Sequence, residues 1–116
     1  MIFGIGTDIT EISRIKRLAE DTKFLKRYFT EQEISYIGDK YHSAAAMYAA
    51  KEAYSKALGT GVRGFCLKDI EIFHDELGKP YIKAYNNAYI DNCDIFLSLS
   101  HCNEYAVAYV IIEKRR

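Results

Sequence analysis

The side chains of this sequence that could do chemistry are two acids, Asp8 and Glu52, a lysine, Lys56, and a histidine, His101. Two separate carboxylates with a lysine and a histidine suggest a site for a hard metal ion. Magnesium takes oxygen ligands, and it often uses only one or two protein carboxylates together with substrate phosphates. A lone histidine is more often structural than catalytic, so these residues gain meaning only if the fold brings them together.

Residues 44–61 predict one long, mostly buried helix, because apolar side chains recur there every three or four positions. Glu52 and Lys56 are four residues apart and share a face of this helix, close to Lys51. Charges on an alanine-rich helix are costly to bury unless they are paired. We therefore expect a salt bridge, a metal ion or an anionic substrate beside them.

Two glycines, Gly59 and Gly61, predict the end of this helix. With Thr60 they form a turn whose backbone N–H groups could hold a phosphate. Helix capping alone is the more common role of such a turn, and the pattern by itself favours it.

Asp8 belongs to a predicted strand over residues 1–12, in which Gly4, Gly6 and Asp8 share one face. The glycines would allow a ligand or another backbone to approach closely. The simpler alternative is that Asp8 ends the strand or caps the next helix, which is a common use of aspartate.

The remaining patterns predict three short helices followed by strands. Thr10 is expected to cap the first of these helices, and Thr30 with Glu33 forms a capping box for the third. The predicted helices lie within 10–19, 21–29 and 30–37, and the predicted strands within 67–73, 81–82, 94–100 and 104–113. Strands that follow helices indicate a single α+β domain, residues 1–116, with a mostly antiparallel sheet wrapped on the long central helix.

Composition excludes several classes of protein. Sixteen basic and sixteen acidic residues cancel, which argues against a nucleic-acid or membrane-surface partner. No apolar run approaches a membrane span, and we see no signal peptide. Three cysteines without CxxC spacing favour reduced thiols and a cytoplasmic location. The basic stretch around Arg14 and Arg17 is either a solvated surface or a docking patch for an acidic partner.

The motifs together resemble the bacterial holo-acyl-carrier-protein synthases, the small type of 4'-phosphopantetheinyl transferase. The similarity runs through nearly the whole chain, and the motifs stand in the family's order. They are GIGTDITEISRI at 4–15, FTEQEISY at 29–36, AAKEAYSKALGTG at 49–61, GKPY at 78–81 and SLSHCNEYAVAYVI at 98–111.

The resemblance implies an enzyme that moves phosphopantetheine from coenzyme A to a serine of apo acyl carrier protein, in support of fatty acid biosynthesis. It implies that Asp8 and Glu52 hold Mg²⁺ on the pyrophosphate, with Glu52 or a metal-bound water as the base. It also implies a homotrimer with sites between subunits. The other implied roles are stabilisation of the leaving group by Lys56, contact with the coenzyme A phosphates by His101, a nucleotide pocket lined by Gly59, Thr60 and Gly61, and docking of the carrier protein by Arg14 and Arg17.

Three positions depart from the family pattern. Met47 stands where many relatives have an arginine, and Lys51 or Arg63 could supply the missing cation to a coenzyme A phosphate. Cys102 replaces an acidic residue after the histidine, and an arginine after the first helix is replaced at Thr22 or Lys23. The competing hypotheses are a non-catalytic nucleotide-binding or scaffold domain and, more weakly, a nucleic-acid-binding domain.

Overall fold

The computed structural model of the chain describes residues 1–59 and 64–116. The elements follow in the order β1 (Ile2–Glu11), α1 (Ile12–Ala19), α2 (Thr22–Tyr28), α3 (Glu31–Ile37), α4 (Tyr41–Leu58), η1 (Leu67–Asp69), β2 (Ile70–His74), β3 (Pro80–Ala84), η2 (Asn86–Ala88), β4 (Cys93–His101) and β5 (Tyr105–Lys114).

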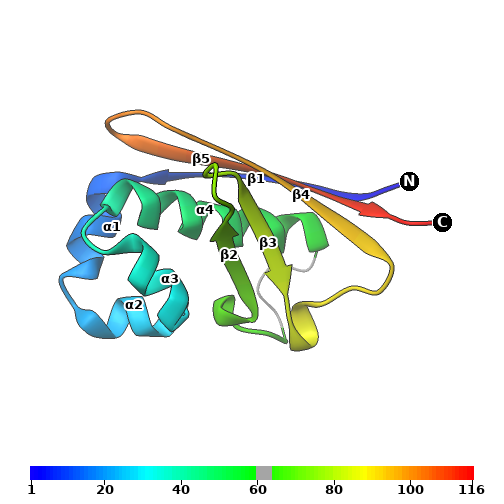
Figure 1. Cartoon of the computed structure of the whole chain (residues 1–116), viewed down its shortest axis with the longest axis horizontal. Coiled ribbons are helices and arrows are strands. Elements are labelled where there is room, and N and C mark those ends of the chain that lie inside the picture. Colours follow the sequence, from blue (N-terminus) through cyan, green and yellow to red (C-terminus); the bar gives the residue numbers. More distant parts are fainter. Residues whose placement is uncertain (60–63) are drawn as a thin grey trace.

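Two antiparallel sheets form the β part of the fold. The larger has the strand order β1-β5-β4, and the smaller is the β2-β3 hairpin. The long helix α4 packs along β1 and β5, and all four α-helices lie on the same side of the larger sheet (Figure 1). The predicted α+β fold, with a mostly antiparallel sheet on a long central helix, is confirmed.

The glycine-bearing face of β1 lets this helix approach the sheet. A Cβ atom at Gly4 would lie 1.8 Å from the carbonyl oxygen of Ala57, and one at Gly6 would lie 1.8 Å from that of Ala53. Since real Cβ atoms do not come this close to other atoms, only glycine permits this backbone-to-backbone contact. The glycines therefore serve the approach of another backbone, the second of the two alternatives that the sequence left open.

Two predictions of helix boundaries are wrong. Thr10 does not cap α1, because it is the buried penultimate residue of β1 and its hydroxyl donates a hydrogen bond to Asp8 instead. Helix α4 begins at Tyr41 rather than at residue 44. Gly38, with a φ of 53°, ends α3. The polar residues that follow it can therefore form the first turn of α4.

The capping box of α3 is confirmed. The backbone N–H of Glu33 donates to Thr30 Oγ1 at 3.2 Å, and the N–H of Thr30 donates to Glu33 Oε1 at 2.9 Å. Gly59 ends α4 in a left-handed conformation, with φ of 83°. Gly61, the second predicted end of this helix, lies outside the described residues.

The outer face of the larger sheet is apolar and uncovered. Its exposed side chains alternate along the strands with the inward-facing ones, and no described helix lies on that side (Figure 1). They are Phe3, Ile5, Ile9, Phe96, Tyr105, Val107 and Tyr109. A contiguous apolar face of this kind is typical of an association surface.

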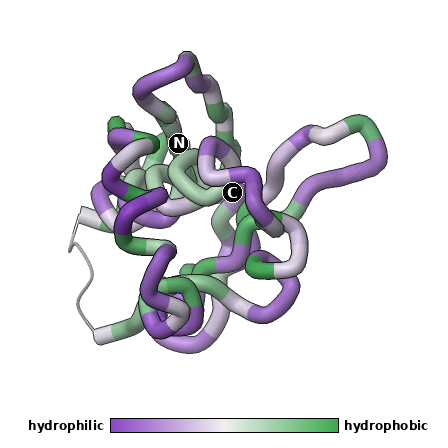
Figure 2. The backbone as a smooth tube through the Cα atoms, turned by 90° about the vertical axis from the view of Figure 1, so that its left-hand side faces the viewer, coloured by the Kyte–Doolittle hydropathy of each residue, from purple (hydrophilic) through white to green (hydrophobic). Residues whose placement is uncertain are grey.

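Hydrophobic and hydrophilic residues are interspersed along the backbone (Figure 2). Accordingly, none of the helices in the described parts of the chain is both long and apolar enough to cross a membrane.

Candidate active site

Asp8 lies where β1 passes the last turns of α4. Its carboxylate is mostly buried, with 17% of the side chain exposed, and it accepts a hydrogen bond from Thr10 Oγ1 at 2.9 Å. Lys56 reaches it from α4, with 3.1 Å between Nζ and Asp8 Oδ1 and 3.0 Å between Nζ and the carbonyl oxygen of Thr7. Asp8 therefore neither ends the strand nor caps α1, and the capping alternative is wrong.

Glu52 lies one helical turn before Lys56, on the same flank of α4. The two do not form the ion pair that their spacing allowed, because Lys56 is paired with Asp8 instead. The pKa of Tyr48 is raised, mostly by burial and secondly by the negative charge of Glu52. The Glu52 carboxylate therefore lies near the Tyr48 ring. Asp8 and Lys56 thus meet where β1 crosses α4, and Glu52 lies one helical turn before Lys56.

This pair of carboxylates suits magnesium by its donor chemistry. In the described parts of the chain, no three His, Cys, Asp or Glu side chains come together as a metal site. Mg²⁺ keeps several waters and is commonly held by one or two carboxylates plus substrate phosphates. Asp8 and Glu52 fit such a site, and a phosphate-bearing substrate would complete it.

Lys51 has a structural role. Its side chain is fully buried, and Nζ donates to Glu33 Oε1 at 2.6 Å and to the carbonyl oxygens of Tyr28 at 2.9 Å and Leu67 at 3.0 Å. An ammonium group has three donors, and all three are used here. This contradicts the prediction that Lys51 contacts coenzyme A or replaces the arginine missing at Met47.

His101 lies on the other side of α4. It is an exposed residue at the end of β4, two strands away from β1, and its ring contacts that of His42 with 4.9 Å between centroids. Both rings line a pocket of about 300 Å³ together with Met47, which points about 140° around the helix from Glu52. Within one chain, the structure therefore does not bring His101 to Asp8, Glu52 and Lys56.

Of the three predicted turn residues, only Gly59 can be placed. Its backbone N–H donates to the carbonyl oxygen of Lys56, so it caps α4 next to the residue that binds Asp8. Thr60, Gly61 and Arg63 lie outside the described residues.

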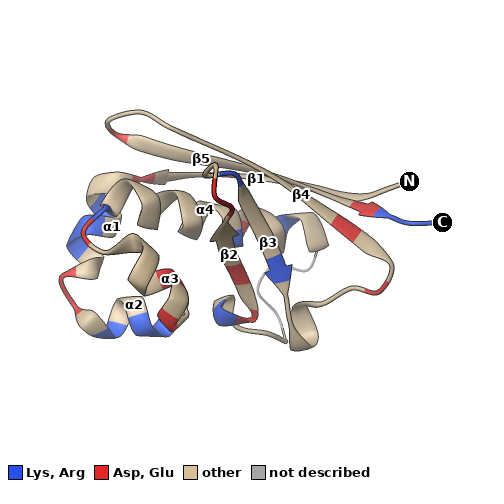
Figure 3. Ribbon diagram, viewed as in Figure 1, with Lys and Arg blue, Asp and Glu red and all other residues tan. Residues whose placement is uncertain are grey.

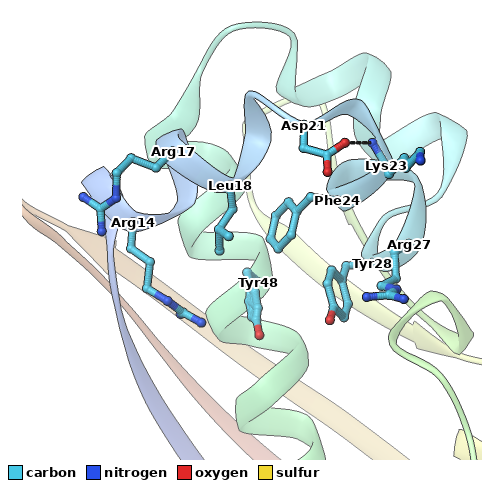
Figure 4. A pocket seen from close by; sticks show the side chains of 9 residues that line it. All are labelled: Arg14, Arg17, Leu18, Asp21, Lys23, Phe24, Arg27, Tyr28 and Tyr48. Carbon is cyan, nitrogen blue, oxygen red and sulfur yellow. Dashed lines mark hydrogen bonds between the residues drawn. The ribbon is translucent and has the colours of Figure 1, made fainter.

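Arg14 and Arg17 border a second pocket, of about 540 Å³, between α1, α2 and α4 (Figure 4). Basic residues are concentrated on α1 and α2, and Lys23 and Arg27 also line this pocket (Figure 3). The positive charge of Arg14 lowers the pKa of Tyr48, opposing the larger effect of burial, so the basic pocket adjoins the Glu52 flank of α4.

An aromatic cluster in this pocket was not predicted from the sequence. The Phe24 ring lies 5.0 Å from that of Tyr28 and 6.2 Å from that of Tyr48, between centroids (Figure 4). The only available signal was the i,i+4 spacing of Phe24 and Tyr28 within α2. The pocket therefore offers an apolar floor as well as a basic rim.

Comparison with known proteins identifies the class. Residues 4–110 match the family model of the 4'-phosphopantetheinyl transferase superfamily, and the chain belongs to this superfamily. It is 51% identical, over 97% of its length and 98% of the relative's, to a holo-[acyl-carrier-protein] synthase of Clostridium botulinum. It is 41% identical to one of Treponema denticola, over 97% and 99% of the two chains. The resemblance to the holo-acyl-carrier-protein synthases is confirmed.

Solved structures agree with this assignment. A holo-(acyl-carrier-protein) synthase from Bacillus anthracis, in complex with CoA (3',5'-ADP), superposes with a TM-score of 0.86, at 39% identity over 98% of each chain. The Helicobacter pylori holo-[acyl-carrier-protein] synthase, in complex with coenzyme A, gives a TM-score of 0.86 at 34% identity, over 94% of this chain and 99% of that one.

Proposed function

We propose that this chain transfers the 4'-phosphopantetheine group of coenzyme A to a serine of apo acyl carrier protein, in support of fatty acid biosynthesis. The observation that carries the proposal is its 51% identity, over nearly the full length of both chains, to a holo-[acyl-carrier-protein] synthase. The Asp8–Lys56 pair, with Glu52 one helical turn before Lys56, adds the acidic and basic groups that phosphoryl transfer needs.

In the proposed reaction, the serine Oγ forms a bond to the phosphorus that bears the pantetheine. The bond from that phosphorus to the bridging oxygen breaks, and adenosine 3',5'-bisphosphate leaves. Glu52 takes the serine proton, directly or through a water molecule. Lys56, which has 55% of its side chain exposed, turns its ammonium group towards the negative charge that develops on the leaving group.

Asp8 and Glu52 hold Mg²⁺ in this proposal. When bound, the ion supplies positive charge to the pyrophosphate oxygens. The Thr10 hydroxyl orients one oxygen of Asp8 by its 2.9 Å hydrogen bond, and the tight packing of Gly6 on Ala53 fixes the strand that carries it.

The active form is a homotrimer with sites between subunits. Two observations support this: the uncovered apolar face of β1-β5-β4, and the separation of His101 from Asp8 within one chain. Association would allow the His101 side of one copy to meet the Asp8 side of another. His101 then contacts the coenzyme A phosphates bound at the neighbouring carboxylates.

The carrier protein docks on the pocket of Arg14 and Arg17. Both side chains are exposed, and the basic rim suits an acidic helix while the aromatic floor suits an apolar side chain of that helix. The pocket borders Tyr48 and therefore lies close to Glu52, where the serine must arrive.

The cysteines Cys66, Cys93 and Cys102 are all unpaired, which supports a reducing, cytoplasmic location.

A carrier-modification assay tests the proposal. Apo acyl carrier protein is incubated with coenzyme A and the protein, with magnesium or with a chelator, and its mass is measured. We expect a mass gain of one phosphopantetheine group with magnesium and none with the chelator. Unmodified carrier under both conditions would contradict the transferase, and full conversion with the chelator would contradict the magnesium site alone.

A further inference from the structure

Helix α2 forms one wall of the pocket that Arg14 and Arg17 border, but the core holds this helix weakly. None of its residues is buried in the described parts of the chain, and it lies on the side of α4 away from the larger sheet (Figure 1). A helix of seven residues is also too short to be stable by itself. The position of its pocket-lining side chains therefore depends on how its ends are held. These side chains are Lys23, Phe24, Arg27 and Tyr28.

The C-terminal end of α2 is bound to α4 by Lys51. Its Nζ donates at 2.9 Å to the carbonyl oxygen of Tyr28, the last residue of α2, and lies 5.1 Å from the ring centroid of the buried Phe29. The last turn of a helix leaves carbonyl groups without partners inside the helix, and Lys51 satisfies one of them from a different helix. At the other end of α2, Asp21 accepts the N–H of Lys23, a contact between sequence neighbours that fixes no distance to α4.

Glu33 makes the attachment of Lys51 rigid. Neither side chain of this pair is exposed, and Glu33 Oε1 accepts from Lys51 Nζ at 2.6 Å and from the N–H of Thr30 at 2.9 Å. Glu33 Oε2 accepts the N–H of Ile72 at 2.8 Å. Because these groups are paired with one another and shielded from water, the ammonium group has no alternative partner to turn to.

Tyr28 connects this buried anchor to the pocket. Lys51 holds its backbone carbonyl, whereas its ring lines the pocket and lies 5.8 Å from that of Tyr48 between centroids (Figure 4). Tyr48 precedes Lys51 by three residues on α4, and Glu52 follows Lys51 directly. The anchor therefore fixes the wall formed by α2 relative to the helix that carries Glu52.

We propose that Lys51 is a positioning residue for the carrier protein, which holds α2 against α4 through the Tyr28 carbonyl, an inference that rests on the proposed transferase function. A binding surface that is already ordered spares the partner the free-energy cost of ordering it. If α2 occupied this position only about a tenth of the time, the apparent affinity for the carrier would fall about tenfold. Lys51 itself is fully buried, so it acts through α2 and not by contact with the carrier.

The double variant Lys51→Met with Glu33→Gln tests this role. Lys51→Met alone would leave a buried, unpaired carboxylate, whereas the carboxamide of the second substitution is neutral and keeps an acceptor for the Thr30 N–H. In the carrier-modification assay we expect the KM for apo acyl carrier protein to rise about tenfold. The kcat and the Kd of coenzyme A, measured by calorimetry, should stay at their wild-type values.

Tyr54→Phe is the matched control. It also removes a buried hydrogen bond from an α4 side chain to a backbone carbonyl, the 2.6 Å contact of Tyr54 with Ala88, but this contact leads to η2 instead of α2. Both variants should lose stability, and only the double variant should have a raised KM for the carrier. An unchanged KM in the folded double variant, or an equal rise in both variants, overturns the positioning role.

Hydrogen exchange of the wild type tests the same role without any variant. The amides of the last turn of α2 should be protected in the free protein, since Lys51 holds that turn before the carrier arrives. Protection that develops only when apo acyl carrier protein is added overturns the inference, even if the double variant does not fold. In each of these cases a wild type that modifies the carrier leaves the transferase standing, whereas a wild type that neither binds nor modifies it contradicts both proposals.

Discussion

Two lysines of one helix show how residues of the same type acquire different roles. Lys51 is fully buried and bonded to three oxygens, whereas Lys56 is 55% exposed and bonded to Asp8. They are five positions apart in the sequence, which turns their side chains about 140° apart around α4. Lys51 anchors the helix in the core, and Lys56 places a positive charge beside Asp8.

The carboxylates of the site should be essential to turnover. We expect Asp8→Asn and Glu52→Gln each to lower the rate of carrier modification by at least about a hundredfold, because each removes an anionic ligand of the proposed magnesium ion. Asp94→Asn is the matched control, since Asp94 pairs with Arg115 at the surface and its substitution should leave the rate unchanged. Wild-type turnover in either site variant would remove the metal assignment.

His74 should make the fold sensitive to acid. Burial lowers its pKa, so below its ordinary value of about 6.5 the unfolded chain binds more protons than the folded one. The stability that its neutral form contributes is present above that value and is lost as the pH falls towards the folded pKa. His74→Phe keeps the stack on Tyr36 but cannot titrate, so its Tm should fall less than that of the wild type between about pH 7.5 and about pH 5.5. Equal losses in the two proteins would contradict this role.

At the scale of elements, the approach of β1 to α4 determines whether the site exists. Asp8 and Lys56 meet because Gly4 and Gly6 remove the side chains that would hold the strand away from the helix. The buried Lys51–Glu33 pair adds a second restraint by linking α4 to α3, and Glu33 Oε2 also accepts the N–H of Ile72 in β2.

Gly6→Ala should therefore damage both stability and catalysis. The new Cβ meets a backbone oxygen at 1.8 Å, so we expect a loss of about 3 kcal/mol of unfolding free energy and a large fall in turnover as Asp8 moves away from Lys56. Gly38→Ala is the control, because its Cβ meets nothing within 4 Å and only the positive φ of its backbone, 53°, opposes the change. Denaturant unfolding and the carrier assay measure the two effects. Equal behaviour of the two variants would show that the close approach is not needed.

Much of the fold could be predicted from local sequence patterns, whereas contacts between residues far apart in the sequence could not. The Thr30–Glu33 box is confirmed, because four consecutive residues contain all of it. The placement of Lys51 could not be predicted, since its partner Glu33 lies 18 residues away on another helix. The contact of His42 with His101 likewise joins residues that are far apart in the sequence, and it leaves no local pattern.

At the scale of the whole molecule, the chain has one covered and one uncovered sheet face. The covered face carries Asp8 on β1 and ends at His101 on β4, with β5 between them. The apolar outer face leaves a surface for other copies. In the proposed trimer, a single chain would therefore supply parts of two sites rather than one complete site.

A charge on the outer face should dissociate the assembly. Ile9 has 63% of its side chain exposed, so Ile9→Glu should leave the isolated fold intact while placing a carboxylate in the proposed interface. We expect light scattering to report a trimer for the wild type and a monomer for this variant, with carrier modification lost. A variant that remains a trimer, or an active monomer, would contradict the shared site.

Subunit mixing tests the account most directly. Asp8→Ala and His101→Ala proteins are unfolded together in equal amounts and refolded, and carrier modification is measured by mass for each variant and for the mixture. Each variant alone should be inactive, and the mixture should regain roughly a quarter of the wild-type rate, because a quarter of randomly formed interfaces combine an intact Asp8 with an intact His101. A mixture as inactive as its components, although it refolds and associates like the wild type, would contradict a transferase site shared between copies.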